Sequence, residues 1–197
     1  MKIGVLALQG DFAEHIRILY QLGVDACEVR LPVHIEGLDG LIIPGGESTT
    51  IGKLAASFGL IEPLRQFSQS HPTWGTCAGA IFLAKDAHRQ QPLLGLMDIT
   101  VQRNAFGRQV DSFEAELMIP ILQDPDRPFR AIFIRAPIIE RVGKGVDVLA
   151  RLDEDGSTRG GRVVAARQQN LLASSFHPEL TQDTRFHRYF LSMVEVV

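Results

Sequence analysis

The sequence has little of what marks several specialised classes of protein. Its two cysteines, Cys27 and Cys77, are too few for the dense, paired framework of a disulfide-stapled fold. The apolar run at the N-terminus ends at Leu8, which is too short for a signal-peptide core, and no other stretch approaches a membrane span. The sequence therefore predicts a reduced, cytoplasmic protein with no membrane partner.

Long runs of one charge and metal-binding motifs are also missing. The formal net charge is −3, and the basic residues are scattered, which argues against nucleic acid as a partner. No CxxC or HExxH motif is present, so neither a metal site nor another cofactor is expected. The length of 197 residues and the 45% hydrophobic content predict one domain, residues 1–197, with a substantial core.

The two halves of the chain differ in their predicted elements. In the first half, apolar strands alternate with amphipathic helices, and the expected strands are 3–8, 24–29, 38–43 and 73–76, with helices at 12–22, 48–58, 60–67 and 78–85. Asp11 is the expected cap of the first helix, and Ser48 or Thr49 of the second. The second half is richer in strands, predicted at 96–101, 113–119, 131–134, 146–152, 163–167 and 171–176, before a closing helix at 183–194.

This order of elements predicts an α/β fold. Strand–helix alternation implies right-handed βαβ units and a mostly parallel central sheet flanked by helices in three layers. The strands of the second half suggest additional antiparallel hairpins.

Cys77 lies in the strongest motif of the chain. Gly75-Thr76-Cys77-Ala78-Gly79 has the form G-x-C-x-G, a nucleophile elbow with sulfur in place of the serine oxygen. The sharp strand-to-helix turn requires small flanking residues, and the helix N-terminus favours thiolate over thiol. The backbone N–H of Ala78 then points to where an oxyanion would form. A free cysteine is more often a small buried hydrophobe; we keep that interpretation for Cys27.

His177-Pro178-Glu179 supplies a base and an acid for the thiolate. The motif follows a predicted apolar strand, so His177 and Cys77 are expected at the same carboxyl edge of the sheet. Pro178 is expected to hold the segment extended, which places His177 and Glu179 on one side and lets the carboxylate fix the ring tautomer. The remaining histidines are expected to be solvated or packed in the core; they are His15, His34, His71, His88 and His187.

Two glycines follow the third predicted strand, in Gly45-Gly46-Glu47-Ser48. Glycines there allow the backbone to approach a ligand closely. One interpretation is a second oxyanion donor, so that Gly45, Gly46 and Ala78 form the oxyanion hole. The alternative is a phosphate cradle at the following helix. Because no phosphate-loop motif is present and Glu47 would repel phosphate, we favour the oxyanion hole.

These motifs resemble those of the class I, or triad, glutamine amidotransferases, whose fold is flavodoxin-like. Within that class the chain resembles the glutaminase subunits of pyridoxal 5′-phosphate synthases, and the match runs nearly end to end. The motifs of the subfamily are Gly4-Val5-Leu6-Ala7-Leu8-Gln9-Gly10-Asp11-Phe12-Ala13-Glu14-His15, Gly45-Gly46-Glu47-Ser48-Thr49-Thr50, Arg103-Asn104-Ala105-Phe106-Gly107-Arg108-Gln109 with Asp111-Ser112-Phe113-Glu114, and Phe133-Ile134-Arg135-Ala136-Pro137.

The resemblance implies hydrolysis of L-glutamine to glutamate and ammonia through a thioester on Cys77. It implies that the glutamine contacts are Gly46, Glu47, Ser48, Arg103, Ile134 and Arg135. It also implies a partner, a TIM-barrel synthase subunit in a large hetero-oligomer, which uses the ammonia to make pyridoxal 5′-phosphate. Gln9 belongs to the region expected to meet that synthase. The connecting segment Gln90-Gln91-Pro92 is expected to touch no motif.

Three other interpretations remain open from the residues alone. The chain could be a glutaminase that serves another synthase, or a cysteine peptidase on a similar fold. It could also be a catalytically silent binding module, although an intact Cys77, His177 and Glu179 argue against this. Without the family resemblance, Arg103 and Arg135 would be read as members of ordinary surface ion pairs.

Overall fold

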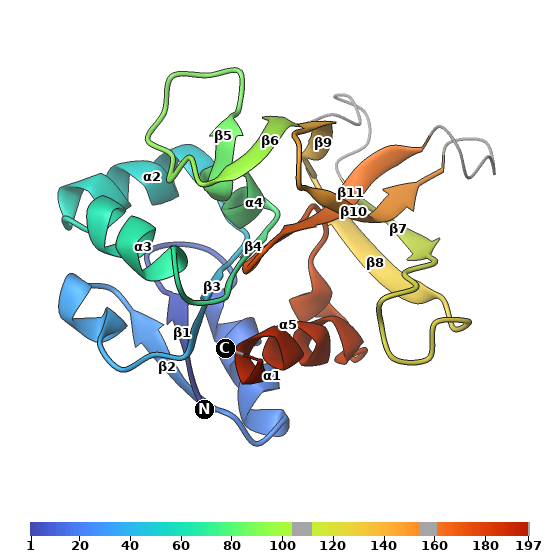
Figure 1. Cartoon of the computed structure of the whole chain (residues 1–197), viewed down its shortest axis with the longest axis horizontal. Helices are drawn as coiled ribbons and strands as arrows, with labels where there is room; N and C mark the ends of the chain where they lie inside the picture. Colours follow the sequence, from blue (N-terminus) through green and yellow to red (C-terminus); the bar gives the residue numbers. More distant parts are fainter. Residues whose placement is uncertain (104–111, 154–160, 197) are drawn as a thin grey trace.

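Ten strands form one curled, mixed sheet in a computed structural model that describes residues 1–103, 112–153 and 161–196 (Figure 1). The strand order is β2-β1-β3-β4-β12-β11-β9-β6-β5, and β10 pairs with β11. The bounds of these strands are β1 (Lys2–Leu6), β2 (Asp25–Val29), β3 (Gly40–Ile43), β4 (Thr73–Thr76), β5 (Ala84–Asp86), β6 (Met97–Gln102), β9 (Ile138–Val142), β10 (Asp147–Leu152), β11 (Arg162–Gln168) and β12 (Leu171–Ser174).

The helices and a small second sheet lie on either side of this sheet. The second sheet is an antiparallel pair, β7 (Ser112–Leu117) and β8 (Phe129–Ile134). The helices are α1 (Phe12–Gln21), α2 (Ser48–Ser57), α3 (Ile61–Ser68), α4 (Ala78–Leu83) and α5 (Arg185–Glu195), with short 3₁₀ turns η1 (Pro32–Ile35) and η2 (Pro178–Leu180). Among the described residues, no helix is both long and apolar enough to cross a membrane.

The direction of pairing divides the sheet into two parts. Strands β2, β1, β3, β4 and β12 are parallel neighbours, as strand–helix alternation predicts. Strands β11, β10, β9 and β6 pair antiparallel with their neighbours, and β5 returns parallel to β6. The structure thus confirms the predicted α/β class with its additional antiparallel strands.

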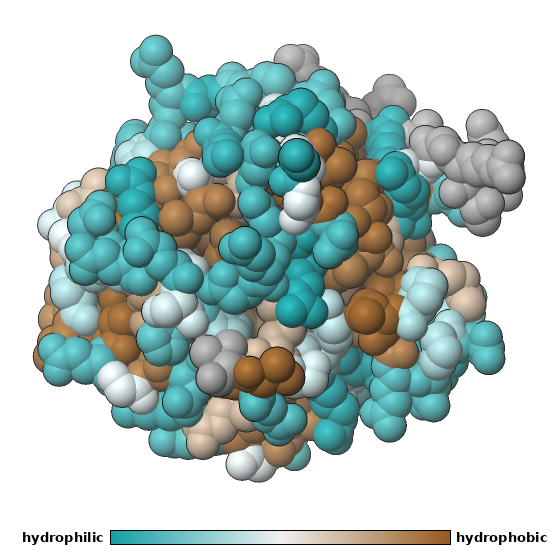
Figure 2. Space-filling view, in the orientation of Figure 1, coloured by the Kyte–Doolittle hydropathy of each residue, from teal (hydrophilic) through white to brown (hydrophobic). Residues whose placement is uncertain are grey.

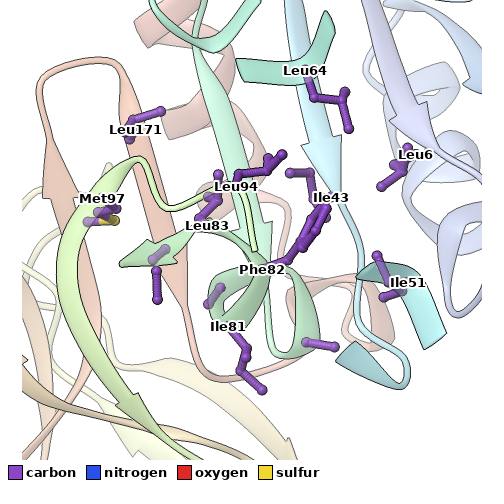
Figure 3. Close-up of a cluster of buried hydrophobic side chains, with 14 of the residues drawn as sticks. Leu6, Ile43, Ile51, Leu64, Ile81, Phe82, Leu83, Leu94, Met97 and Leu171 are labelled. Atoms are coloured by element: carbon purple, nitrogen blue, oxygen red, sulfur yellow. The ribbon is translucent and has the colours of Figure 1, made fainter. Parts of the chain in front are cut away.

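Successive side chains of the parallel strands point to opposite faces of the sheet, where they pack into two hydrophobic clusters. On β3, Leu41 and Ile43 belong to the cluster beneath α2, α3 and α4, and Figure 3 labels Ile43, Phe82 and Leu83 within it. Ile42 belongs instead to the cluster beneath α1 and α5, which also takes in side chains of β7 and β8. Hydrophilic side chains cover much of the outer face seen in Figure 2, with apolar patches between them.

Several predicted element boundaries are wrong. The helix predicted at 78–85 ends at Leu83, because the chain continues as β5 and extends the sheet beyond β6. Strand β9 is absent from the sequence-based prediction, since Glu140 and Arg141 interrupt its apolar pattern. Asp11 precedes α1 but its side chain makes no capping hydrogen bond.

Glu47, rather than Ser48 or Thr49, caps helix α2. Its carboxylate accepts the backbone N–H of Thr49 at 3.1 Å and that of Thr50 at 2.7 Å, two of the donors that a helix start leaves without partners. Burial raises the pKa of this carboxyl, but hydrogen bonds from Thr50, Thr49 and Arg103 prevail and lower that pKa to about 2. The sequence-based choice failed because serine and threonine are the commoner caps.

The elbow around Cys77 depends on two glycines that have no room for a side chain. A Cβ on Gly75 would lie 2.4 Å from the carbonyl oxygen of Gly79, and a Cβ on Gly79 would lie 1.9 Å from that of Ile43. Both distances are well below contact, and both obstacles are backbone. This is the close approach of strand and helix that the G-x-C-x-G pattern predicts.

Gly79→Ala should destabilise the fold because the new methyl group meets the backbone of β3. Overpacking of this kind costs about 1–3 kcal/mol of unfolding free energy, measured by urea denaturation. Ala56→Ser, which also adds one heavy atom but on the exposed side of α2, is the control and should change it by less than about 0.5 kcal/mol. An unchanged midpoint for Gly79→Ala would contradict the close packing.

Glu47→Gln should destabilise the protein at neutral pH and progressively less in acid. The pKa of Glu47 is lowered from 4.5 to about 2 on folding, so its ionised form stabilises the fold above pH 4.5. That stabilisation is lost as the pH falls from 4.5 toward 2. Melting temperatures of wild type and variant should therefore converge in this range. Glu36→Gln, on an exposed loop, is the control; a constant Glu47→Gln difference across the range would refute this account.

Candidate active site

The parallel strands bring four segments to one edge of the sheet. Strands β1, β3, β4 and β12 are consecutive neighbours in the sheet, all parallel, so their carboxyl ends meet there. The segments that leave these ends are 7–11, 44–47, Cys77 with α4, and 175–179. Cys77 and His177, which are distant in sequence, are thereby placed at the same edge.

Cys77 occupies a strained backbone conformation at the elbow. Its φ of 47° lies in the left-handed region, which a non-glycine residue rarely adopts. The sheet maintains this conformation, because the Cys77 N–H donates to the carbonyl oxygen of Ser174, the last residue of β12, at 2.7 Å. The side chain is 7% exposed, and its Sγ lies 3.9 Å from the carbonyl oxygen of Ile134. The backbone of the cysteine is thus fixed, and the residue borders a pocket.

His177 and Glu179 form a buried pair. The Nδ1 atom of His177 lies 2.7 Å from Oε1 of Glu179, and both side chains are nearly inaccessible to solvent. The contact is as expected, but the predicted extended backbone is wrong. Residues Pro178–Leu180 form the 3₁₀ turn η2, which the N–H of Leu180 closes onto the His177 carbonyl oxygen at 3.3 Å. The turn brings the carboxylate back toward the ring.

The surroundings of His177 favour its protonated form. Burial lowers the pKa of the imidazole, but the contacts with Asp11, Cys77 and Glu179 prevail and raise it. Cys77 is thus one of the groups whose proximity favours the imidazolium. An imidazolium beside a cysteine can stabilise a thiolate and can later donate a proton to a leaving group.

Asp11 is a residue of this site that the sequence analysis missed. Instead of capping α1, its Oδ2 lies 3.4 Å from Nδ1 of His177. Its backbone N–H donates to the carbonyl oxygen of Gly45 at 3.2 Å. The available signal was its position just after β1, the parallel strand next to β3.

A pocket of about 300 Å³ opens in front of Cys77. It is lined by Gln9, Gly46, Glu47, Ser48, Cys77, Ala78, Ile81, Arg103, Ile134, Arg135 and Pro137. All six residues expected to contact glutamine are among them. Ile81 and Pro137 also line the pocket and were not anticipated.

The two glycines of the predicted oxyanion loop have different surroundings. Gly46 lines the pocket, as does Ala78. Gly45 lies against the ring of His177 instead, since a Cβ there would meet Cε1 of that residue. Gln9 fixes the loop, because its Oε1 accepts the N–H of Glu47 at 2.6 Å.

Arg103 and Arg135 both line the pocket but are held differently. Arg103 donates to Glu47 at 2.9 Å at the rim of the pocket. The ion pair expected for Arg103 without the family resemblance is therefore present. Arg103 also donates to the side chain of Gln91 at 3.3 Å, so the expectation that this connecting segment touches no motif is wrong. Arg135 is exposed and follows β8 directly, with a φ of 44°, which is a strained backbone conformation.

The surroundings of the other histidines differ from one to the next. His15 and His187 are fully buried, whereas His88 is exposed and paired with Glu140.

In the described part of the chain, one group has the spacing of a metal site, and it consists of Asp11, His177 and Glu179. Glu179 hydrogen-bonds the imidazole and Asp11 lies within ion-pair distance of it, so these three side chains already contact one another. The motif residues 104–109 and Asp111 lie outside the described residues.

Comparisons with known proteins identify the family of the chain. The profile of the SNO glutamine amidotransferase family matches residues 5–196. Proteins named pyridoxal 5′-phosphate synthase subunit PdxT are 55% identical in Roseiflexus sp. (strain RS-1) and 56% identical in Herpetosiphon aurantiacus, each match covering 98% of this chain and 100% of the relative.

Solved structures extend the comparison. A crystal structure described as a glutamine amidotransferase is 52% identical and superposes with a TM-score of 0.88 over 98% of both chains. The structure of PurLQS from Thermotoga maritima shares the fold at 15% identity, with a TM-score of 0.69 over 97% of both chains. The family match spans almost the whole chain, and the protein therefore belongs to the SNO glutamine amidotransferase family.

Proposed function

We propose that the protein hydrolyses L-glutamine to L-glutamate and ammonia through Cys77, His177 and Glu179. The observation that carries the proposal is the pocket in front of Cys77, which gathers every residue that the family resemblance assigns to glutamine. Its volume of about 300 Å³ suits a single small molecule. The reaction requires no cofactor.

In the first half-reaction, the Cys77 thiolate attacks the side-chain amide carbon and a C–S bond forms. The imidazolium of His177 gives its proton to the amide nitrogen as the C–N bond breaks, and ammonia leaves. The product is a thioester on Cys77. The raised pKa of His177 supports this step, because it keeps a proton ready for the leaving group.

In the second half-reaction, His177 takes a proton from water as the water attacks the thioester. The C–S bond breaks, the product leaves and loses its carboxyl proton to solvent as glutamate, and the Cys77 thiolate and His177 imidazolium are restored. Glu179 orients the ring throughout by accepting a hydrogen bond from the Nδ1–H group, for which the 2.7 Å contact is suitable.

The oxyanion of both tetrahedral intermediates would be held by backbone N–H groups of Ala78 and the Gly45–Gly46 loop. Arg103 and Arg135 would bind the charged end of glutamine, since guanidinium pairs well with carboxylate. Ser48 and Ile134 would complete the contacts. The lining of the pocket supports these roles.

The ammonia would pass to a pyridoxal 5′-phosphate synthase subunit, a TIM barrel in a large hetero-oligomer in the cytoplasm. Support comes from the relatives in Roseiflexus and Herpetosiphon, which are named as subunits of that synthase. A peptidase is less well supported, because the pocket is small. A silent binding module would not need the strained cysteine next to a buried His–Glu pair.

Cys77→Ala should abolish ammonia release from glutamine, with a loss on the order of a thousandfold or more, as expected for removal of a nucleophile. A glutamine-analogue electrophile should label the Cys77 peptide in mass spectrometry. Cys27→Ala, which changes the half-buried cysteine of β2, should retain both activity and labelling. Equal rates for Cys77→Ala and wild type would refute the proposal.

Addition of a pyridoxal 5′-phosphate synthase subunit from a PdxT-containing organism should raise the glutaminase rate, and the two chains should co-purify. The expected reason is that partner binding near Gln9 orders the loop that Gln9 holds. Equal rates with and without synthase would count against this. Stimulation by another ammonia-accepting synthase would instead favour a different pathway.

A further inference from the structure

Two histidines that the proposed mechanism does not use lie behind the triad. His15 comes from α1 and His187 from α5, and Figure 1 shows these helices close together. Both side chains are 0% exposed. Nδ1 of His15 lies 3.0 Å from Nε2 of His187, and both rings meet Trp74 edge-on. Two adjacent imidazoles are an unusual choice for a hydrophobic core.

The pair ends on the catalytic carboxylate. Glu179 uses Oε1 to accept from His177, whereas its Oε2 is buried without a hydrogen bond of normal geometry in the described structure. Nε2 of His15 lies 3.4 Å from this oxygen and equally far from the hydroxyl of Thr76. A buried carboxylate oxygen with no donor is costly. His15 is placed to supply that donor.

The two rings can share protons in two ways, and the surroundings favour one. Burial lowers the pKa of both, and for His15 the neighbouring His187 lowers it further, so both are neutral. If His187 donates from Nε2 to Nδ1 of His15, then His15 carries its proton on Nε2 and directs it at Glu179.

The reverse arrangement has two defects. It would turn a nitrogen lone pair of His15 toward the carboxylate. It would also bury an N–H on Nδ1 of His187, an atom with no partner in the described structure. An orphaned donor is rarer in proteins than an orphaned acceptor. The first arrangement is therefore the stable one.

We propose that His15 is a positioning residue of the glutaminase, which holds Glu179 ionised and correctly oriented, and that His187 sets the tautomer of His15. The inference rests on the proposed role of the triad. The charged or titratable groups around Glu179 are His15 on α1, His177 on its own segment and Asp11 before α1; His187 on α5 faces His15. Without His15, burial would favour the protonated carboxyl.

The test compares two amides that replace different ring nitrogens. In His15→Gln the side-chain NH₂ reaches about as far as Nε2 and can still donate to Glu179. In His15→Asn the amide reaches only the position of Nδ1, so the contact with His187 survives but the donor is lost. His71→Gln and His71→Asn are the controls, since His71 stacks on Phe67 away from the site.

His15→Asn should lower kcat for glutamine about 10-fold with KM changed little, the effect of losing one hydrogen bond to a charged group. The acid limb of its kcat/KM profile should move to higher pH, because an unsupported Glu179 binds its proton more readily. His15→Gln should restore both toward wild type. His187→Asn should fall below His187→Gln for the same reason.

Equal kcat and equal acid limbs for wild type and His15→Asn would overturn the proposal. So would equal losses in His15→Asn and His15→Gln that follow their melting temperatures, since that pattern indicates a structural role only. Cys77→Ala separates the two levels of inference. An active Cys77→Ala would overturn the triad, whereas an inactive Cys77→Ala beside a wild-type-like His15→Asn would overturn only the role of His15.

Discussion

The close approach of helix α4 to strands β3 and β4 is the constraint on which the site depends. It is possible only because Gly75 and Gly79 lack side chains, and it forces Cys77 into a left-handed backbone conformation. Such strain persists where the surroundings over-determine it. Here the parallel ladder between β4 and β12 does so, through the N–H of Cys77 and the carbonyl of Ser174. The same ladder sets the distance between the cysteine and the segment that carries its histidine.

The ionisable groups near this elbow have neighbours that determine their protonation states. Glu47 is kept ionised by the N-terminus of α2 and by Arg103, and in turn it shapes one wall of the pocket. His177 is kept protonated against burial by the groups it hydrogen-bonds. Glu179 is the group with least support, because burial raises its pKa and one of its oxygens lacks a well-formed hydrogen bond in the described structure. His15 matters here because its Nε2 is placed to donate to that oxygen.

Local patterns in the sequence were enough to predict the strand edge, the elbow and the pairing of His177 with Glu179. They failed wherever a distant part of the chain decides the outcome. The backbone of residues 177–179 forms a turn rather than an extended segment, although the contact is the one predicted. His15 looks like an ordinary helix residue until α5 and η2 pack against it. Strand β9, with charged residues in its middle, is a strand because β6 and β11 flank it.

The two carboxylates near Nδ1 of His177 illustrate why geometry and burial must be weighed together. Glu179 is at 2.7 Å and inaccessible to solvent, whereas Asp11 is at 3.4 Å with a side chain that is 39% exposed. The shorter distance gives Glu179 the hydrogen bond, since 3.4 Å is beyond the usual range for N–H···O. Solvent around Asp11 weakens its Coulomb attraction further. Asp11 therefore favours the imidazolium through its charge alone. The orientation of the ring is set by Glu179, and through Glu179 by the neighbouring His15.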